Sequence, residues 1–132
     1  GVIYAVEPSS DVFERHVVLD LSAQTASTQD DGLMDVELHP EFGREDSPHG
    51  RMFFIFHQHT TANDGIDVSS TYRTPTSTRL TRFEMKPGLL EADLSTETVL
   101  IDQPDRTSIH NGGAMFFHPK DGFLYLALGD EG

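Results

Sequence analysis

The segment from Ile109 to Ala114 carries the residues best suited to chemistry in this chain. It reads Ile-His-Asn-Gly-Gly-Ala and leads from a polar loop into an apolar run. The imidazole of His110 can accept a proton near neutral pH, and the glycines after it allow a close backbone approach or positive φ angles. The pattern indicates a general base at the start of a strand, with Asn111 binding substrate or fixing the turn. The alternative is a turn in which His110 merely caps the strand.

Four other histidines and one aspartate are weaker candidates. His57 and His59 are two residues apart, so on a strand both would face one side and could bind a metal. No third ligand accompanies them, so we favour a solvated strand face and assign no metal ligand. His39 and His118 each precede a proline and are expected to be structural parts of turns. Asp130 follows an apolar run in a Gly-Asp-Glu-Gly sequence, where it could line a site or form a turn.

Short apolar runs must position these residues. Several alternate apolar and polar residues with a period of two, as half-buried strands do, and turn-forming residues lie between them. No long apolar stripe has helical spacing, so the chain is predicted to be all-β. The polar stretches 22–31 and 60–78 are predicted to be functional or mobile loops. The expected strands are residues 2–6, 17–21, 34–38, 51–59, 79–85, 98–101, 114–117 and 123–128.

A weak internal repeat predicts how the strands are arranged. Three pairs of segments match in order: 18–20 with 100–102, 36–40 with 115–119, and 50–55 with 122–127. Tandem four-stranded antiparallel units are typical of a β-propeller, and a β-sandwich is the alternative. We therefore predict outer strands of one blade in residues 1–21, one full blade in 32–101 and the start of the next in 110–132.

Composition excludes several classes of function. Of 132 residues, 36% are hydrophobic and 23% charged, which is typical of a folded protein. The 22 acidic and 9 basic residues give a net charge of −13, which argues against binding nucleic acid or anionic lipid. No apolar stretch is long enough for a transmembrane helix, and the absence of cysteine excludes disulfides and thiolate catalysis. Because the chain starts without methionine and stops straight after an apolar run, we expect it to come from a longer protein.

Three motifs resemble the glucose/sorbosone dehydrogenase family. Residues 110–113 with 117–132 resemble its His-Asn-Gly-Gly … Pro-Asp-Gly-x-Leu-Tyr-x-x-x-Gly-Asp-Gly-Gly stretch. Residues 32–42 are similar to its Gly-Leu-Leu-Gly-x-x-x-His-Pro-x-Phe, and 79–83 to its Arg-x-x-Arg-Phe/Tyr strand. The matches follow the family's order over nearly the whole chain, which thus resembles an N-terminal fragment of a soluble aldose sugar dehydrogenase that uses pyrroloquinoline quinone.

The resemblance implies a six-bladed propeller, of which this chain would form about one and a half blades. It implies a secreted, periplasmic or extracellular oxidoreductase that oxidises the C1 hydroxyl of an aldose-like sugar with pyrroloquinoline quinone and calcium. It also allows an electron-acceptor protein as partner. The quinone-clamping arginine and most calcium ligands of the family lie in later blades, so the chain alone is expected to be inactive.

The resemblance also implies roles for individual residues. His110 takes the place of the general base, and Asn111 and Asp130 are assigned to substrate binding. A quinone-binding glutamine of the family corresponds to Asp30, with Gln29 beside it, so both are assigned to the cofactor. Ile109 stands where soluble glucose dehydrogenases have aspartate, which argues against a glucose specialist.

A second class of function is compatible with the same sequence. A propeller of this kind can also be a non-catalytic extracellular module that binds carbohydrate or protein, because a fold does not fix a function. The enzyme requires His110 together with a cationic clamp, whereas the binding module requires neither.

Overall fold

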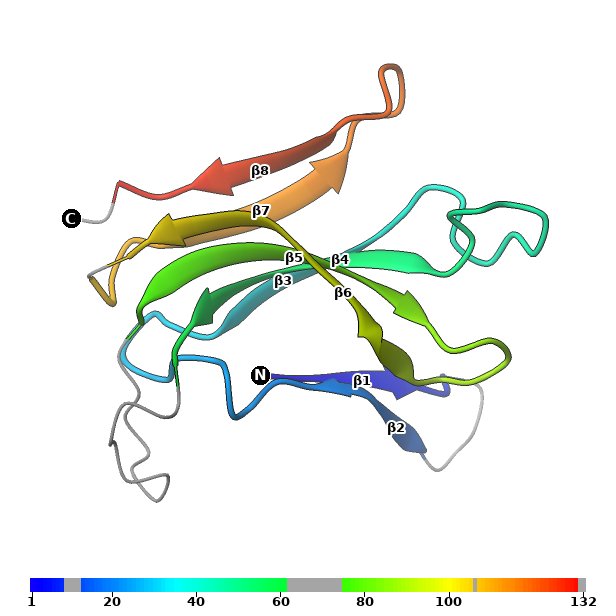
Figure 1. The fold of residues 1–132 in the computed structure, drawn as a ribbon, viewed down its shortest axis with the longest axis horizontal. Coiled ribbons are helices and arrows are strands. Elements are labelled where there is room, and N and C mark those ends of the chain that lie inside the picture. Colours follow the sequence, from blue (N-terminus) through cyan, green and yellow to red (C-terminus); the bar gives the residue numbers. More distant parts are fainter. Residues whose placement is uncertain (9–12, 62–74, 106, 131–132) are drawn as a thin grey trace.

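A computed structural model describes residues 1–8, 13–61, 75–105 and 107–130. In these ranges the regular structure consists of strands in antiparallel sheets (Figure 1). The all-β prediction is confirmed, whereas the described strands do not close into a ring. No helix that could cross a membrane occurs among the described residues. The strands are β1 (Val2–Val6), β2 (Arg15–Asp20), β3 (Leu33–Leu38), β4 (Met52–His59), β5 (Ser77–Met85), β6 (Ala92–Pro104), β7 (Gly112–Phe117) and β8 (Leu124–Leu128).

The strands form a central sheet between two hairpins. The first hairpin is β1–β2, the central sheet has the order β3-β4-β5-β6, and the last hairpin is β7–β8. Figure 1 shows the first hairpin on one side of the central sheet and the last on the other. Separate apolar clusters fill the two interfaces.

Strand β4 contributes to both clusters. Its side chains alternate between the two faces, so Phe53 and Ile55 pack toward the first hairpin while Phe54 and Phe56 pack toward the last. Every residue of β4 is buried. A strand covered on both faces has a continuous apolar sequence, and Met-Phe-Phe-Ile-Phe is such a sequence.

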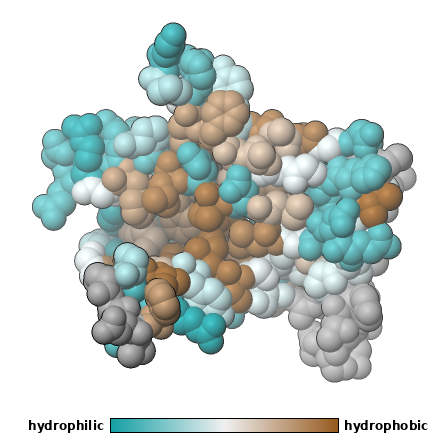
Figure 2. Space-filling view, turned by 180° about the vertical axis from the view of Figure 1, so that it is seen from behind, coloured by the Kyte–Doolittle hydropathy of each residue, from teal (hydrophilic) through white to brown (hydrophobic). Residues whose placement is uncertain are grey.

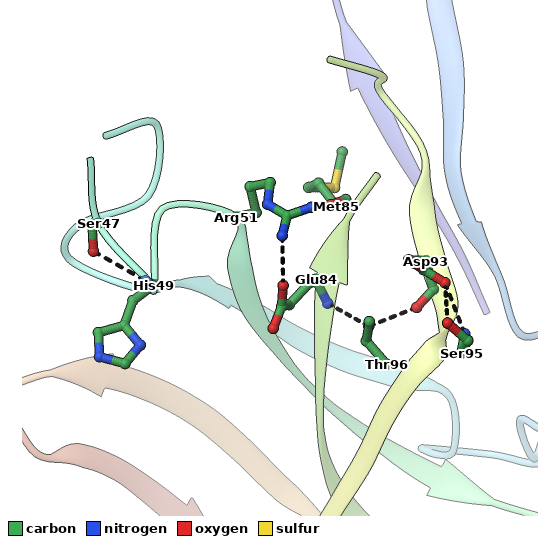
Figure 3. Close-up of polar contacts among 8 residues, drawn as sticks. All are labelled: Ser47, His49, Arg51, Glu84, Met85, Asp93, Ser95 and Thr96. Atoms are coloured by element: carbon green, nitrogen blue, oxygen red, sulfur yellow. Dashed lines mark hydrogen bonds and ion pairs between the residues drawn. The ribbon is translucent and has the colours of Figure 1, made fainter. Parts of the chain in front are cut away.

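The outermost strand is longer than predicted. The sequence predicts 98–101, whereas β6 spans Ala92–Pro104. Side chains replace ladder bonds where its register with β5 shifts: the Thr96 hydroxyl accepts from the Glu84 amide at 2.9 Å and donates to the Asp93 carbonyl at 2.6 Å (Figure 3). Nearby, the Arg51 guanidinium bonds the Met85 carbonyl at 3.0 Å and the Glu84 carboxylate at 3.1 Å. The Thr96 contacts explain why the largely polar first half of β6 is a strand.

The polar stretch 22–31 is packed along the end of β4. The Ala26 amide donates to the Gln58 carbonyl at 2.8 Å, and the Thr60 amide donates to the Gln24 carbonyl at 2.9 Å. Thr25 and Ala26 are buried. We call residues 22–31 the strap, because they tie the first hairpin to the central sheet. Of the second predicted loop, 62–74 lie outside the described residues, and its last two residues belong to β5.

The repeat holds in three dimensions with one correction. The His39 amide donates to the Met52 carbonyl, and the His118 amide donates to the Phe123 carbonyl. Met52 therefore corresponds to Phe123, not to Leu124 as the matched glycines predict. The alignment is wrong by one residue because the two turns differ in length and hydrogen bonding. With this correction, Leu124 and Leu126 of the last hairpin, which pack on the central sheet, correspond to Phe53 and Ile55 of β4, which pack toward the first hairpin.

One carboxylate links the central sheet to the last hairpin. Asp35, at the register shift of β3, accepts the Met115 amide of β7 at 2.6 Å. The same strands approach closely at Gly113, where a Cβ atom would lie 2.7 Å from the Met34 Cβ. The hydrogen bond between Asp35 and Met115 therefore fixes the position of β7, which begins directly after His110 and Asn111.

We predict that Asp35→Ala destabilises the intact protein, because the Met115 amide loses its acceptor. The expected loss in free energy of unfolding is about 1–3 kcal/mol, the cost of an unpaired buried donor. Asp35→Asn should retain most of the stability, since an amide oxygen can accept the same bond. Urea unfolding measures the loss, with Glu37→Ala on the same strand as control. Equal midpoints for Asp35→Ala and Glu37→Ala would contradict the proposed link.

Candidate functional site

Three segments that are distant in sequence meet at one end of the sheets. The Asp30 amide donates to the Ser108 carbonyl at 3.0 Å, and the Gly129 amide donates to the Asn111 carbonyl at 3.1 Å. The end of the strap, the loop before β7 and the residues after β8 therefore lie side by side. All five residues that the sequence analysis assigned to a site lie in these segments: Gln29, Asp30, His110, Asn111 and Asp130.

His110 projects from a constrained backbone. Its φ is 59°, an uncommon value for a residue other than glycine, and its side chain is 60% exposed. The His110 Nδ1 atom lies 3.0 Å from the Asp130 Oδ1 atom. If Nδ1 carries the proton shared with that carboxylate, Nε2 is the nitrogen able to accept another proton. The pair thus has the arrangement of a base oriented by a carboxylate, a contact that the sequence analysis did not predict.

Glycines make this backbone possible. Gly112 and Gly113 have φ angles of 73° and 117°, which residues with a Cβ rarely adopt. At Gly129 a Cβ atom would lie 1.4 Å from the His110 carbonyl oxygen. The backbone after β8 therefore crosses directly against the backbone of His110, and only glycine fits there.

Asn111 points inward. Its residue is 5% exposed, and its Nδ2 atom lies 3.1 Å from the Asp31 Oδ1 atom and 3.5 Å from the Asp30 carbonyl. Of the two roles proposed from the sequence, this geometry favours fixing the turn over contacting substrate.

A model of the family described as Glucose / Sorbosone dehydrogenase matches residues 1–132. The chain belongs to this family. Membership supports a sugar dehydrogenase-like, oxidoreductase function for the protein.

A layer of buried and half-buried polar residues lies against the loop of the glucose/sorbosone dehydrogenase motif. Burial raises the pKa of Asp31 above the usual aspartate value, and the charge of Asp105 adds to the rise, whereas hydrogen bonds from Thr28 and Asn111 oppose it. Asp105 is 2% exposed and accepts the Thr78 hydroxyl at 2.9 Å and the Thr107 amide at 2.9 Å. Sequence analysis missed this layer, because Asp31 and Asp105 lie in polar segments of ordinary loop composition.

The prediction that His57 and His59 lie on a solvated strand face is wrong. They are 2% and 6% exposed, because the strap covers the end of β4. Their ring centroids are 5.8 Å apart. Among the described residues, no group of three or more histidine, aspartate or glutamate side chains could hold a metal ion.

The histidines of the two His-Pro turns make turn contacts, as expected. His39 Nδ1 accepts the Glu41 amide at 3.2 Å, and its ring packs against Phe117. His118 Nδ1 lies 3.1 Å from the Asp121 carboxylate.

The described residues at this end do not by themselves fit pyrroloquinoline quinone, the cofactor that the family implies. The quinone is an anion with several carboxylates, which require cations or hydrogen-bond donors. Among the described residues, four aspartates lie at this end, Asp30, Asp31, Asp105 and Asp130. The guanidinium of Arg79, which follows Thr78 on β5, is paired with Asp102 at 3.0 Å. Of the two residues assigned to the cofactor, Gln29 can donate a hydrogen bond, whereas Asp30 adds negative charge. Both are exposed beside the loop of His110.

We predict that His57 makes the protein less stable in acid. Its pKa is lowered from 6.5 to about 4, first by burial and then by the charges of His59 and Arg79. Between these pH values the unfolded chain binds a proton that the folded chain does not, so the free energy of unfolding falls as pH falls. The total loss is about 3 kcal/mol at 1.36 kcal/mol per pKa unit.

Unfolding measured between pH 7 and 4 checks this prediction. His57→Leu should reduce the change in free energy of unfolding between pH 7 and 4, whatever the stability of this variant at pH 7. His16→Gln, a change at an exposed histidine of β2, should leave the dependence as it is. An unchanged slope in His57→Leu would show that other groups cause the acid sensitivity.

Proposed function

We propose that this chain forms the part of a quinone-dependent aldose dehydrogenase that carries the general base, His110. The observation that supports the proposal is the exposed imidazole with Nδ1 3.0 Å from Asp130, which leaves Nε2 to face a substrate. Membership of the family supports the sugar dehydrogenase chemistry.

The chemistry proposed for His110 is the removal of one proton. Oxidation of an alcohol at C1 removes the hydroxyl proton together with a hydride, and a positioned base accelerates that proton transfer. Asp130, expected from the sequence to bind substrate, is proposed instead to hold the imidazole in the orientation that directs Nε2 outward. A quinone and calcium would be held mainly by groups outside the described residues.

We also propose that the three sheets belong to successive blades of a propeller. The corrected repeat supports this, because it relates the last hairpin to the inner strands of the central sheet. The outer face of the last hairpin is apolar: Phe116 and Tyr125 stack with centroids 5.3 Å apart and are 53% and 45% exposed. Figure 2 shows apolar side chains gathered in the middle of one face of the molecule, with polar ends on either side. Such surfaces suit burial against further sheets.

The proposal includes a location and partners. The protein would act in the periplasm or outside the cell on a small sugar, and an electron-acceptor protein would take the electrons. The acidic surface, at a net charge of −13, fits neither nucleic acid nor an anionic membrane as a partner.

A carbohydrate- or protein-binding module is the second candidate. The four aspartates among the described residues of the site favour it, because a quinone anion needs cations to bind it. The two candidates differ in whether the intact protein oxidises sugar.

We predict that His110→Ala in the intact protein lowers aldose-dependent dye reduction by about a hundredfold to ten-thousandfold. The assay supplies quinone and calcium and tests a panel of aldoses, and the 132-residue chain alone should be inactive. Thermal stability should change little, because His110 is exposed. His16→Ala is the matched control. Sugar binding without turnover in the unmodified protein would favour the binding module, and full turnover in His110→Ala would exclude His110 as the base.

A further inference from the structure

We propose that Asp31 is a positioning residue: its carboxylate holds the buried amide of Asn111 and so fixes the backbone from which His110 projects. This inference rests on the proposed function of His110 as a base.

The contacts of Asn111 leave the adjoining backbone little freedom. Its side-chain amide lies 3.1 Å from the Asp31 Oδ1 atom, and its carbonyl accepts the Gly129 amide at 3.1 Å. Both ends of the residue are therefore held. His110 has a positive φ and an exposed ring, so its orientation depends on this neighbour and on Asp130 rather than on packing. A strained residue of this kind persists only when its surroundings fix it.

Asp31 is itself held in place. The Thr28 hydroxyl bonds its Oδ2 atom, and the Asp31 amide donates to the Thr28 carbonyl at 2.8 Å. The strap that carries both residues is bonded through Ala26 to Gln58 of β4, and through Gln24 to Thr60 just after that strand. Hydrogen bonds, together with the short backbone of the strap between Ala26 and Thr28, thus connect the buried strand to the residue next to the proposed base.

At position 31 the geometry requires a hydrogen-bond acceptor for the Asn111 side-chain amide, and it does not require a negative charge. Burial and Asp105 both disfavour the ionised carboxyl and raise the pKa of Asp31, so the charge itself costs stability at neutral pH. An asparagine could accept the same bond from Asn111 without that cost, and its NH₂ group could donate to the Thr28 hydroxyl, which now donates to Oδ2. Asp31→Asn should therefore preserve the clamp and be at least as stable, whereas Asp31→Ala removes the clamp.

The test compares these two variants in the intact protein, with Glu97→Ala, at an exposed position of β6, as control. One readout is hydrogen exchange of the Gly129 amide, which donates to Asn111, and the other is the separation of kcat from KM for aldose oxidation. In Asp31→Ala we expect exchange about tenfold faster or more and kcat lower by about ten- to a hundredfold with little change in KM, since a small misplacement can cost that much. Asp31→Asn should resemble the unmodified protein in both.

Two results would overturn the proposal: unchanged exchange at Gly129 in Asp31→Ala, or equal impairment in Asp31→Asn and Asp31→Ala. If Asp31→Ala does not fold, Thr28→Val removes only the hydroxyl that holds the carboxylate, and it should change exchange in the same direction by less. If the unmodified protein oxidises no aldose, the proposed function fails, while the exchange measurement still decides whether Asp31 positions Asn111.

Discussion

Burial of β4 on both faces is the constraint on which the rest of the structure depends. Phe53 and Ile55 cover one interface, Phe54 and Phe56 cover the other, and each such side chain stabilises the fold by about 1.5–3 kcal/mol. Because both faces are apolar, hydrophobic alternation alone does not fix the register of β4, and a slip of one residue would still bury apolar groups. The polar residues at its end must therefore specify the register.

Gln58 is the residue that does so most directly. Its amide donates to the Gly32 carbonyl at 2.9 Å, and its side-chain amide lies 2.7 Å from the Thr78 hydroxyl. That hydroxyl also lies 2.9 Å from the Asp105 carboxylate, so its single proton lies between two acceptors, Gln58 Oε1 and Asp105 Oδ2. A slip would leave these buried groups unpaired, at about 1–3 kcal/mol each. The same few residues thus fix both the register of β4 and the position of the strap.

Sequence analysis predicted the strands whose apolar residues follow a local period. It missed the features that depend on segments remote in sequence that cover those strands or bond to them. The apolar strands were located to within a few residues, whereas the polar first half of β6 was not, because side-chain bonds to β5 replace apolar burial there. The burial of His57 depends on the strap, which is remote in sequence. Asp31 and Asn111 are 80 positions apart, and no local pattern in the sequence links them. The candidate site residues were chosen from motifs, while the contacts of His110 with Asp130 and of Asn111 with Asp31 required the fold.

The position of the proposed base is therefore a property of stacked sheets rather than of a loop. His110 has a positive φ, which is strained for a residue with a Cβ and persists only where its neighbours hold it, whereas Gly112 and Gly113 adopt their positive φ angles readily. Directly after it, Gly113 packs against Met34 and Phe56, and the Met115 amide bonds Asp35. Because Phe56 belongs to β4 and Asp35 to β3, a change in the spacing of the sheets would move the imidazole as well. The packing of the apolar core therefore determines where the imidazole of the candidate active site lies.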